Sequence, residues 1–363
     1  MKKTLIIRLT SLILLLCILS SIFVSCNIGN SNAGGLKEPT TQAKSYYEFF
    51  DTVSIIYSYK GDSEQEFEQN HKIVAEVLGK YHKLFDIYYE YSGINNIRTI
   101  NKNAGKSAVK VDRELIDFLL YCKELYTFTN EKTNIMLGSV LKLWHDCREK
   151  SKKSEGILNP EFLPTVQSLT SANEHTSIDL LVINEEELTV YITDPNAAID
   201  VGAIGKGYAT EKAAQVLIDN NVTSYVLNIG GNLRAIGNKV DGTEWITGIT
   251  NPDKSSDENI ACRVKMGDTS LVTSGDYERF FYAGDVKYHH IIDPSTLYPA
   301  AYFPSVSIFA KDSGLADALS TALFCMSYEE GKALADSIDG VEVVWITFDG
   351  TILHTDGVEF VSK

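Results

Sequence analysis

One stretch, from Ile199 to Gly231, constrains the fold more than any other part of the chain. It reads IDVGAIGKGYATEKAAQVLIDNNVTSYVLNIGG and runs from a glycine-rich loop, through an amphipathic segment, to a β-rich segment. Apolar residues recur at helical spacing after the loop, and β-branched and aromatic residues crowd residues 225–229. The stretch therefore predicts a loop, a helix and a strand in direct succession.

The loop itself, with Gly202, Gly205 and Gly207, admits two interpretations. Glycines allow backbone N–H groups to approach a phosphate, and the start of a helix favours an anion. Neither common phosphate motif fits, because Asp200 stands where a P-loop has its first glycine and Thr210 stands where the dinucleotide fingerprint has its third. The loop is thus either an unusual phosphate cradle or a tight turn that packs closely on a sheet.

The N-terminus has the features of an export signal. Lys2, Lys3 and Arg8 precede an apolar run that ends at Ser25-Cys26, which is typical of a bacterial lipoprotein signal. We expect residues 1–25 to be a signal peptide, Cys26 to carry the lipid and residues 26–45 to be a flexible tether before a catalytic domain at 46–363. A plain signal peptide or an uncleaved anchor helix are the alternatives. The expected location is extracytoplasmic, on the bacterial cell membrane.

Charge and cysteine content exclude several classes of protein. The formal net charge is -15, and loss of Lys2, Lys3 and Arg8 with the signal would leave -15 - 3 = -18. Such an acidic chain is unsuited to nucleic acid. A phosphate-rich ligand would need a metal ion between it and this protein. The cysteines beyond Cys26 are widely spaced and include no CxxC pair, so the sequence indicates neither a zinc site nor a dense disulfide framework.

Helical and strand patterns interleave without a regular β-α repeat, which predicts a mixed α+β fold, not a doubly wound sheet. Helices are expected at 64–85, after Asp112, at 313–326 and at 329–337. Strands are expected at 46–59, 178–192 (a hairpin around 184–187), 233–236, 245–249, 260–264, 271–273, 287–292 and 341–348.

The clearest chemical group is Asp317, Ser320 and Thr321. On a helix Asp317 and Thr321 are four residues apart and share a face, with Ser320 beside them. A carboxylate and a hydroxyl are hard ligands that suit Mg²⁺ and not zinc. The alternative is an ordinary helix in which Asp317 faces water and Thr321 bonds to its own backbone.

Two further segments carry polar groups. Thr273 to Arg279 offers hydroxyls and an arginine for a ligand, although a polar turn with a structural ion pair would explain it equally. His289 and His290 are neighbours on an expected strand, so at most one of them should enter any one site.

The order of these groups along the chain resembles that of the ApbE family, the FAD:protein FMN transferases. This resemblance strengthens the functional interpretation of each group. The similarity covers nearly all of the chain after the signal. The matching blocks are Phe50-Asp51-Thr52, Phe85-Asp86-Ile87-Tyr88, Leu137-Gly138 through Leu143-Trp144, Ile199 to Ala209, Asn228 to Asn232, Thr273 to Arg279, His289 to Pro294 and Ala316 to Thr321. One departure is Leu297, which follows Asp293-Pro294-Ser295-Thr296 where a glycine is usual.

The resemblance implies an activity and a set of site residues. The family binds FAD and Mg²⁺, cleaves the pyrophosphate, attaches FMN to a threonine or serine of a partner protein and releases AMP. It implies a two-lobed single catalytic domain and an acceptor among flavin-carrying subunits of membrane electron-transport complexes or extracellular reductases. By position in the motifs, the metal ligands would be Asp317, Thr321, Ser320 and the backbone oxygen of Ala203. The residues around FAD would be Phe50, Tyr88, Lys132, Thr133, Asn134, Asp200, Lys206 and Ile292. His290 would be the base that deprotonates the acceptor hydroxyl.

Other functions stay open at this stage. Water could replace the protein hydroxyl, which would make the chain an FAD pyrophosphatase. The chain could bind flavin without catalysis, or be a tethered solute-binding protein for an unrelated ligand. Asp276 and Asp293, in neighbouring blocks, are alternative bases to His290.

Overall fold

The structure is a computed structural model that describes residues 41–362. The expected signal peptide, Cys26 and the tether up to residue 40 lie outside this range. Within residues 41–362, no helix is long and apolar enough to cross a membrane.

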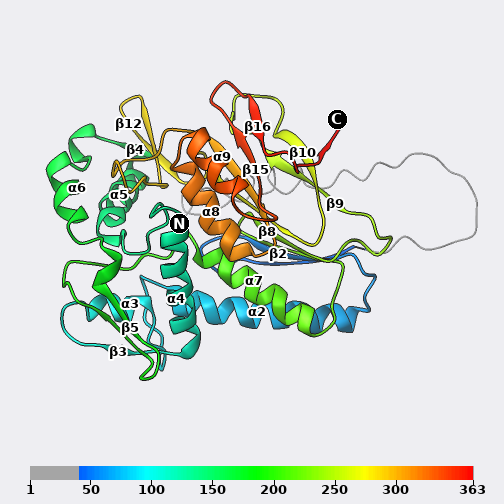
Figure 1. Ribbon diagram of the computed structural model, residues 1–363, viewed down its shortest axis with the longest axis horizontal. Coiled ribbons are helices and arrows are strands. Elements are labelled where there is room, and N and C mark those ends of the chain that lie inside the picture. The colour runs from blue at the N-terminus through cyan, green and yellow to red at the C-terminus, as the bar shows by residue number, and fades with distance from the viewer. Residues whose placement is uncertain (1–40, 363) are drawn as a thin grey trace, which may run out of the picture.

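The centre of the fold is an eight-stranded sheet in which every neighbouring pair is antiparallel. Its order is β1-β2-β7-β8-β11-β14-β15-β16 (Figure 1). The strands are β1 Gln42–Tyr46, β2 Ser54–Ser58, β7 Tyr225–Ile229, β8 Asn232–Ile236, β11 Ser270–Gly275, β14 Ser305–Ala310, β15 Glu342–Ile346 and β16 Ile352–His354.

Helices cover one face of this sheet. In Figure 1, α2 and α7 run side by side along it, and α8 crosses beside them. Alternate residues of the central strands, such as Ile56, Leu227 and Ile229, enter the main hydrophobic core together with these helices. The helices are α2 Glu64–Phe85, α7 Gly205–Asp219 and α8 Ser313–Phe324, with α9 Tyr328–Asp336 behind α8.

A second, three-stranded sheet covers the opposite face, so the body has three layers. The intervening strand residues Val226, Leu271 and Phe309 pack there against Trp245 and Val264. The order of this sheet is β17-β10-β9, with β9 Trp245–Thr250, β10 Ile260–Met266 and β17 Phe360–Val361.

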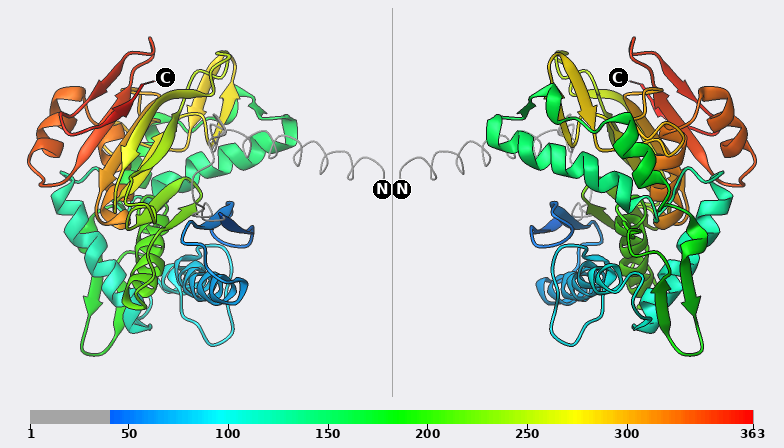
Figure 2. Two further views of the ribbon diagram at one scale, coloured as in Figure 1. Left: turned by 90° about the vertical axis from the view of Figure 1, so that its right-hand side faces the viewer. Right: turned by 90° about the vertical axis from the view of Figure 1, so that its left-hand side faces the viewer.

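The remaining elements form a region beside the layered body; in Figure 2 its helices α3 to α6 are cyan to green and its β12–β13 hairpin is yellow. Ile97, Leu115 and Val190 of this region share the main core with α2 and α7. Its helices are α3 Ile97–Lys102, α4 Arg113–Phe128, α5 Gly138–Ser151 and α6 Val166–Asn173. Its strands are β3 Val109–Lys110, β5 Leu181–Asn184 and β6 Thr189–Ile192 in one sheet, and β4 Ile157–Leu158, β12 Phe280–Ala283 and β13 Val286–His289 in another.

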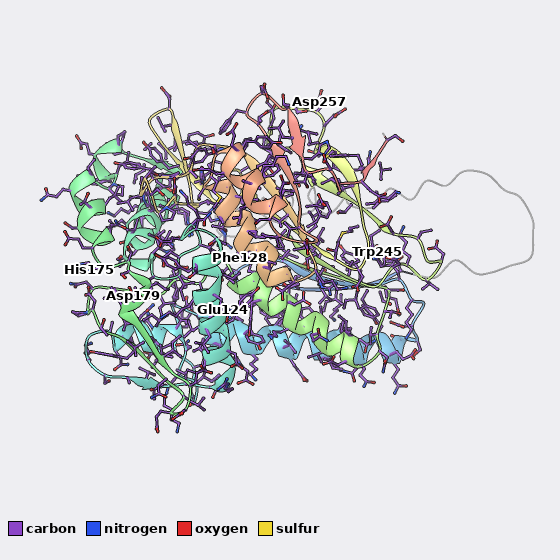
Figure 3. The ribbon with its side chains drawn as sticks, viewed as in Figure 1. Glu124, Phe128, His175, Asp179, Trp245 and Asp257 are labelled. Carbon is purple, nitrogen blue, oxygen red and sulfur yellow. The ribbon has the colours of Figure 1, made fainter. Side chains whose placement is uncertain are left out.

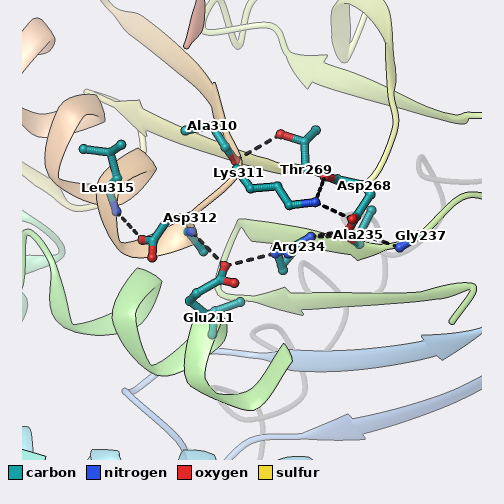
Figure 4. A network of polar contacts seen from close by, with 12 residues as sticks. Glu211, Arg234, Ala235, Gly237, Asp268, Thr269, Ala310, Lys311, Asp312 and Leu315 are labelled. Atoms are coloured by element: carbon teal, nitrogen blue, oxygen red, sulfur yellow. Dashed lines mark hydrogen bonds and ion pairs between the residues drawn. The ribbon is translucent and has the colours of Figure 1, made fainter. Parts of the chain in front are cut away.

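An ionic network around a buried arginine joins the layers (Figure 4). Arg234 on β8 is 1% exposed and donates from Nε to Glu211 of α7 at 3.0 Å and from Nη1 to Asp268 at 2.9 Å. Glu211 also accepts from the backbone N–H of Ser313 at 2.9 Å, at the start of α8. One carboxylate thus ties α7 to both the sheet and α8, and this fixes where α8 lies.

The mixed α+β class is confirmed, and several boundaries differ from expectation. Helix 64–85 is confirmed, with Ser63 and Glu66 forming a capping box. Gln42–Tyr46 is a strand paired to β2, so this part of the expected tether belongs to the sheet. The strand expected at 46–59 is confirmed over Ser54–Ser58 only. The strand expected at 287–292 ends at His289. Strand β14 lies outside the expected strands, and all six of its residues are buried, including Ser305 and Ser307.

Candidate functional site

A cleft of about 500 Å³ lies between the sheet edge, α2, α5, the start of α7 and the β12–β13 hairpin. This size is ordinary for a cofactor site. Five of the sequence-predicted residues border it, namely Phe50, Tyr88, Asp200, Lys206 and His290. They come from four separate segments, and the fold brings them together.

Phe50 reaches the cleft from a strained turn between β1 and β2. Phe50 and Asp51 have φ values of 54° and 52°, a left-handed conformation that bulky residues rarely adopt. His82 on α2 holds this turn, because its Nδ1 accepts from the Phe50 N–H at 3.2 Å and its ring meets the Phe50 ring edge-on at 5.6 Å. Sequence reasoning missed His82, which belongs to none of the motifs.

Asp86, the residue that follows α2, organises the segment that carries Tyr88. One carboxylate oxygen accepts from the backbone N–H groups of Tyr88 at 2.6 Å and Tyr89 at 2.9 Å. The other accepts from the Tyr91 hydroxyl at 2.7 Å, and that hydroxyl lies 3.4 Å from His82 Nε2. Tyr88 and Phe50 are therefore positioned by one connected set of contacts.

His290 borders the cleft, and one of its ring nitrogens has no protein partner among the described residues. Its Nδ1 is buried and makes no hydrogen bond to the residues that the structure describes. Burial, followed by the positive charges of Arg279, Arg148 and Lys206 and the neighbouring His289, lowers the pKa of His290 from 6.5 to about 3. The imidazole is therefore neutral at pH 7 and carries one unprotonated ring nitrogen.

His289 also borders the cleft, against the expectation that only one of the pair would. Strand β13 ends at His289, so the alternation of side chains along a strand does not extend to His290. The ring of His289 is used structurally: Nε2 bonds to the Ala300 carbonyl at 2.8 Å and Nδ1 accepts from the Ile291 N–H at 3.2 Å.

Three cations border the cleft: Arg148, Lys206 and Arg279. Arg148 was not foreseen, because it stands in a charged helix end where the sequence gives no sign of a site. Burial, then the nearby Arg279, lowers the pKa of the Arg148 guanidinium. Two guanidinium groups this close favour an anionic ligand between them. The Thr273–Arg279 turn also carries an ion pair, between Asp276 and Lys287 at 2.7 Å, so both of its interpretations hold in part.

Asp200 lies opposite these cations on the loop before α7. Its backbone N–H donates to Ile135 at 2.8 Å, and its Oδ1 accepts from the Gly202 N–H at 2.9 Å. Burial raises the pKa of the Asp200 carboxyl. Burial and then the charge of Asp200 raise the pKa of Tyr88, which places these two side chains in one electrostatic environment.

The start of α7 packs directly on the helix that carries Asp317. The Gly207 N–H donates to Asp317 Oδ2 at 2.8 Å, and Lys206 Nζ lies 3.6 Å from Oδ1. A Cβ at Gly207 would lie 2.2 Å from the Ser313 carbonyl oxygen, so only glycine allows this approach. For Gly207, the tight-packing interpretation is therefore correct.

The oxygens predicted to bind the metal come from two neighbouring elements. Asp317 is 4% exposed, and Ser320 donates to its carbonyl at 2.8 Å and contacts Ser274 Oγ at 2.8 Å. Thr321 is partly buried on the same helix, and Ala203 precedes α7. No group of three or more His, Cys, Asp or Glu that could hold a metal occurs among residues 41–362. A metal here would thus be held by one carboxylate with hydroxyl and carbonyl oxygens, a hard donor set that fits Mg²⁺.

The other residues predicted to contact FAD do not border the cleft. Thr133 donates from its hydroxyl to the Ala318 carbonyl at 2.9 Å, which holds its segment against α8. Asn134 donates to Thr176 at 2.9 Å. Lys132 pairs with Asp293 at 2.9 Å, and Ile292 is 4% exposed in a core cluster. Their predicted contacts with FAD stay predictions.

The alternative bases are engaged elsewhere. Asp276 pairs with Lys287 and Asp293 with Lys132, and neither carboxylate borders the cleft, whereas His290 does. The turn after Asp293 contains Leu297 at φ 65°, so a leucine takes the left-handed conformation where glycine is usual.

Fold and cleft together define a mixed α+β protein with a cofactor-sized site that combines cations, aromatic rings and a neutral histidine. Comparison with known proteins identifies the class. The model of the ApbE family matches residues 51–345, and the chain belongs to this family. The resemblance drawn from the ordered motifs is thereby confirmed.

Individual relatives agree. The FAD:protein FMN transferase of Treponema pallidum (strain Nichols) is 34% identical over 72% of this chain and 73% of its own length. That of Haemophilus influenzae is 25% identical over 78% of this chain and 80% of its own. The crystal structure of the ApbE protein from Thermotoga maritima is 26% identical with a TM-score of 0.73, covering 87% of this chain and 97% of that one.

Proposed function

We propose that this protein transfers FMN from FAD to a threonine or serine hydroxyl of a partner protein, with Mg²⁺, and releases AMP. The relatives named FAD:protein FMN transferase support the reaction class. The observation that carries the proposal here is the unpartnered Nδ1 of a neutral His290 in the same cleft as Arg148, Arg279 and Lys206. A proton acceptor beside an anion-binding group is what attack of a hydroxyl on a pyrophosphate needs.

The three cations explain how such an acidic chain can bind a pyrophosphate. Arg148 and Arg279 approach from α5 and the β11–β12 turn, and Lys206 from the start of α7. In this arrangement they neutralise the phosphate oxygens from three sides and hold the phosphorus near His290. Because Lys206 lies 3.6 Å from Asp317, its ammonium also connects this group to the metal ligands.

Asp317, Thr321, Ser320 and the Ala203 carbonyl would hold the Mg²⁺. The ion would supply charge neutralisation on the pyrophosphate oxygens. The Gly207 N–H holds one Asp317 oxygen at 2.8 Å and leaves the other directed toward Lys206. The backbone thereby orients the carboxylate before any ligand binds.

The aromatic residues would bind the flavin. Phe50 and Tyr88 lie on the turn and segment that His82 and Asp86 position, and both border the cleft. Asp200 faces the same space. Lys132, Thr133, Asn134 and Ile292 are proposed for the remainder of the FAD pocket.

His290 would take the proton of the acceptor hydroxyl as its oxygen attacks the FMN phosphorus, and AMP would leave. A threonine hydroxyl is a poor nucleophile at neutral pH and needs such a base. The proposed acceptors are flavin-carrying subunits of membrane electron-transport complexes or extracellular reductases. A lipid on Cys26 would keep the enzyme at the membrane where such partners lie.

The test is covalent labelling. The purified protein is incubated with FAD, Mg²⁺ and a soluble flavin-carrying domain of such a subunit, and flavin fluorescence that co-migrates with the domain on a denaturing gel is measured. We expect labelling with the wild-type protein and none with Asp317→Ala or with EDTA. Conversion of FAD to FMN and AMP without labelling of any acceptor would instead establish a pyrophosphatase.

A further inference from the structure

The β12–β13 hairpin has two faces, and only one of them belongs to the cleft. Phe281 and Tyr288 stack on each other at 5.5 Å and border the cleft. Phe280 and Tyr282 alternate with Phe281 along β12 and project to the other side, where they are 38% and 41% exposed. The outer face therefore lies one strand thickness from the proposed reaction centre.

Further exposed apolar side chains lie on the neighbouring strand and on the segment that follows it. Ile157 on β4 stands directly beside Tyr282 in the register of the sheet and is 58% exposed. Phe162, shortly after β4, is 57% exposed. Two lysines lie over aromatic rings, Lys287 over Phe280 at 5.3 Å and Lys150 over Phe162 at 5.7 Å. We call these six residues the hairpin patch.

The composition of the hairpin patch is that of a binding surface. Exposed aromatic residues gathered on one face are uncommon on proteins without a partner and are enriched at the centres of interfaces. The surrounding charge selects the partner. Residues 142–162 and 276–289, which carry the patch and its surroundings, hold seven basic and seven acidic side chains, 7 - 7 = 0, in a chain whose net charge is -15. An acidic partner is therefore repelled less by this face than by the protein as a whole.

We propose that the hairpin patch docks the acceptor protein, through an apolar contact residue and acidic residues near its reacting hydroxyl. This inference rests on the proposed function. Its basis is continuity: the hairpin whose outer face forms the patch leads directly into His290, and Arg279 immediately precedes Phe280. An acceptor on this face can pass its hydroxyl over the hairpin edge into the cleft.

The first test separates docking from catalysis. Flavinylation rates are measured against concentration of an acceptor domain that the wild-type protein labels. Phe280→Ser and Tyr282→Ser should each raise KM for the acceptor about tenfold, as for interface aromatic residues. The kcat and the FAD affinity should not change, because neither side chain borders the cleft. The control is Phe360→Ser, also a strand residue at 38% exposure and far from β12, near the C-terminus (Figure 1).

The second test concerns charge. Lys150→Glu should raise the acceptor KM and weaken its dependence on salt. Lys239→Glu is the matched control, because Lys239 also lies over an aromatic ring, that of Trp245 at 6.0 Å. Trp245 is labelled in Figure 3 at the opposite end of the molecule from β12, so this change should leave the acceptor KM unaltered.

The outcomes of these tests separate the docking surface from the proposed function. If the wild-type protein labels the domain and Phe280→Ser has the same KM as Phe360→Ser, the docking surface is wrong and the proposed function stands. The docking surface is equally wrong if the patch variants change only the self-association of the protein or its binding to anionic lipid vesicles. If the wild-type protein labels no acceptor, the proposed function fails and the docking surface fails with it.

Discussion

His290 is the residue on which the chemistry depends most. His290→Gln should lower kcat for flavinylation by about 10²–10⁴, the usual contribution of a general base, and leave FAD binding nearly unchanged. The measurements are single-turnover labelling and FAD titration. His289→Gln is the comparison, and it should act mainly on stability, since both ring nitrogens of His289 bond to the backbone. Equal losses of kcat in the two variants would contradict the assignment.

The depressed pKa of His290 also predicts a pH dependence of stability. The folded protein keeps this imidazole neutral down to about pH 3, while the unfolded chain takes up a proton near 6.5. Between these values the unfolded state binds more protons, so this group lowers the free energy of unfolding as pH falls from about 6.5 toward 3. Urea unfolding at pH 7 and pH 5 should show a smaller loss in His290→Gln than in the wild-type protein.

His82 should affect FAD binding through Phe50, which it positions. Phe50 is held at φ 54° by its N–H bond to His82 Nδ1 and by ring contact. A strained turn persists only where its surroundings fix it. His82→Leu should raise the Kd for FAD about tenfold, with a smaller effect on kcat at saturating FAD. Tyr89→Phe, on the same rim of the cleft, serves as control. An unchanged Kd in His82→Leu would show that the turn holds without His82.

At the scale of elements, the contact between α7 and α8 positions the residues proposed to bind the metal. In Gly207→Ala the new Cβ would lie 2.2 Å from the Ser313 oxygen and 2.4 Å from Asp317 Cβ, so the helices must separate. We expect a loss of about 1–3 kcal/mol in the free energy of unfolding and a weaker response of activity to Mg²⁺. Gly202→Ala is the control for stability, since its Cβ would meet only the flexible Asp200 side chain, at 3.1 Å. Equal stability of the two variants would refute this account.

Elements with a clear local signal were predictable. The helix at Glu64–Phe85 has a capping box and an apolar stripe, and its bounds agree with the structure. Strand β14 departs from the usual pattern, because Ser305 and Ser307 alternate with Val306 and Ile308 in the sequence and yet are buried as deeply as they are. The sequence does not reveal the β1–β2 hairpin, because its turn uses Phe50 and Asp51 in a conformation that a bulky residue such as phenylalanine rarely adopts.

At the scale of the whole molecule, the sequence predicts those site residues that stand in a motif. Phe50, Tyr88, Asp200, Lys206 and His290 stand in ordered blocks and meet in the cleft. Arg148 and His82 stand outside every block. Only the packing of α5 and α2 brings them to the same cleft, and such contacts between distant residues leave no local pattern in the sequence.

The central claim is that FMN goes to a protein hydroxyl, and the intact mass of the acceptor tests it most directly. After incubation with FAD and Mg²⁺, the acceptor domain should gain the mass of one FMN per reacting hydroxyl, with one AMP released for each FMN attached. Replacement of the reacting threonine by alanine should abolish both the mass gain and the matching AMP. Release of AMP with an unchanged acceptor mass, for every acceptor domain offered, would contradict the account.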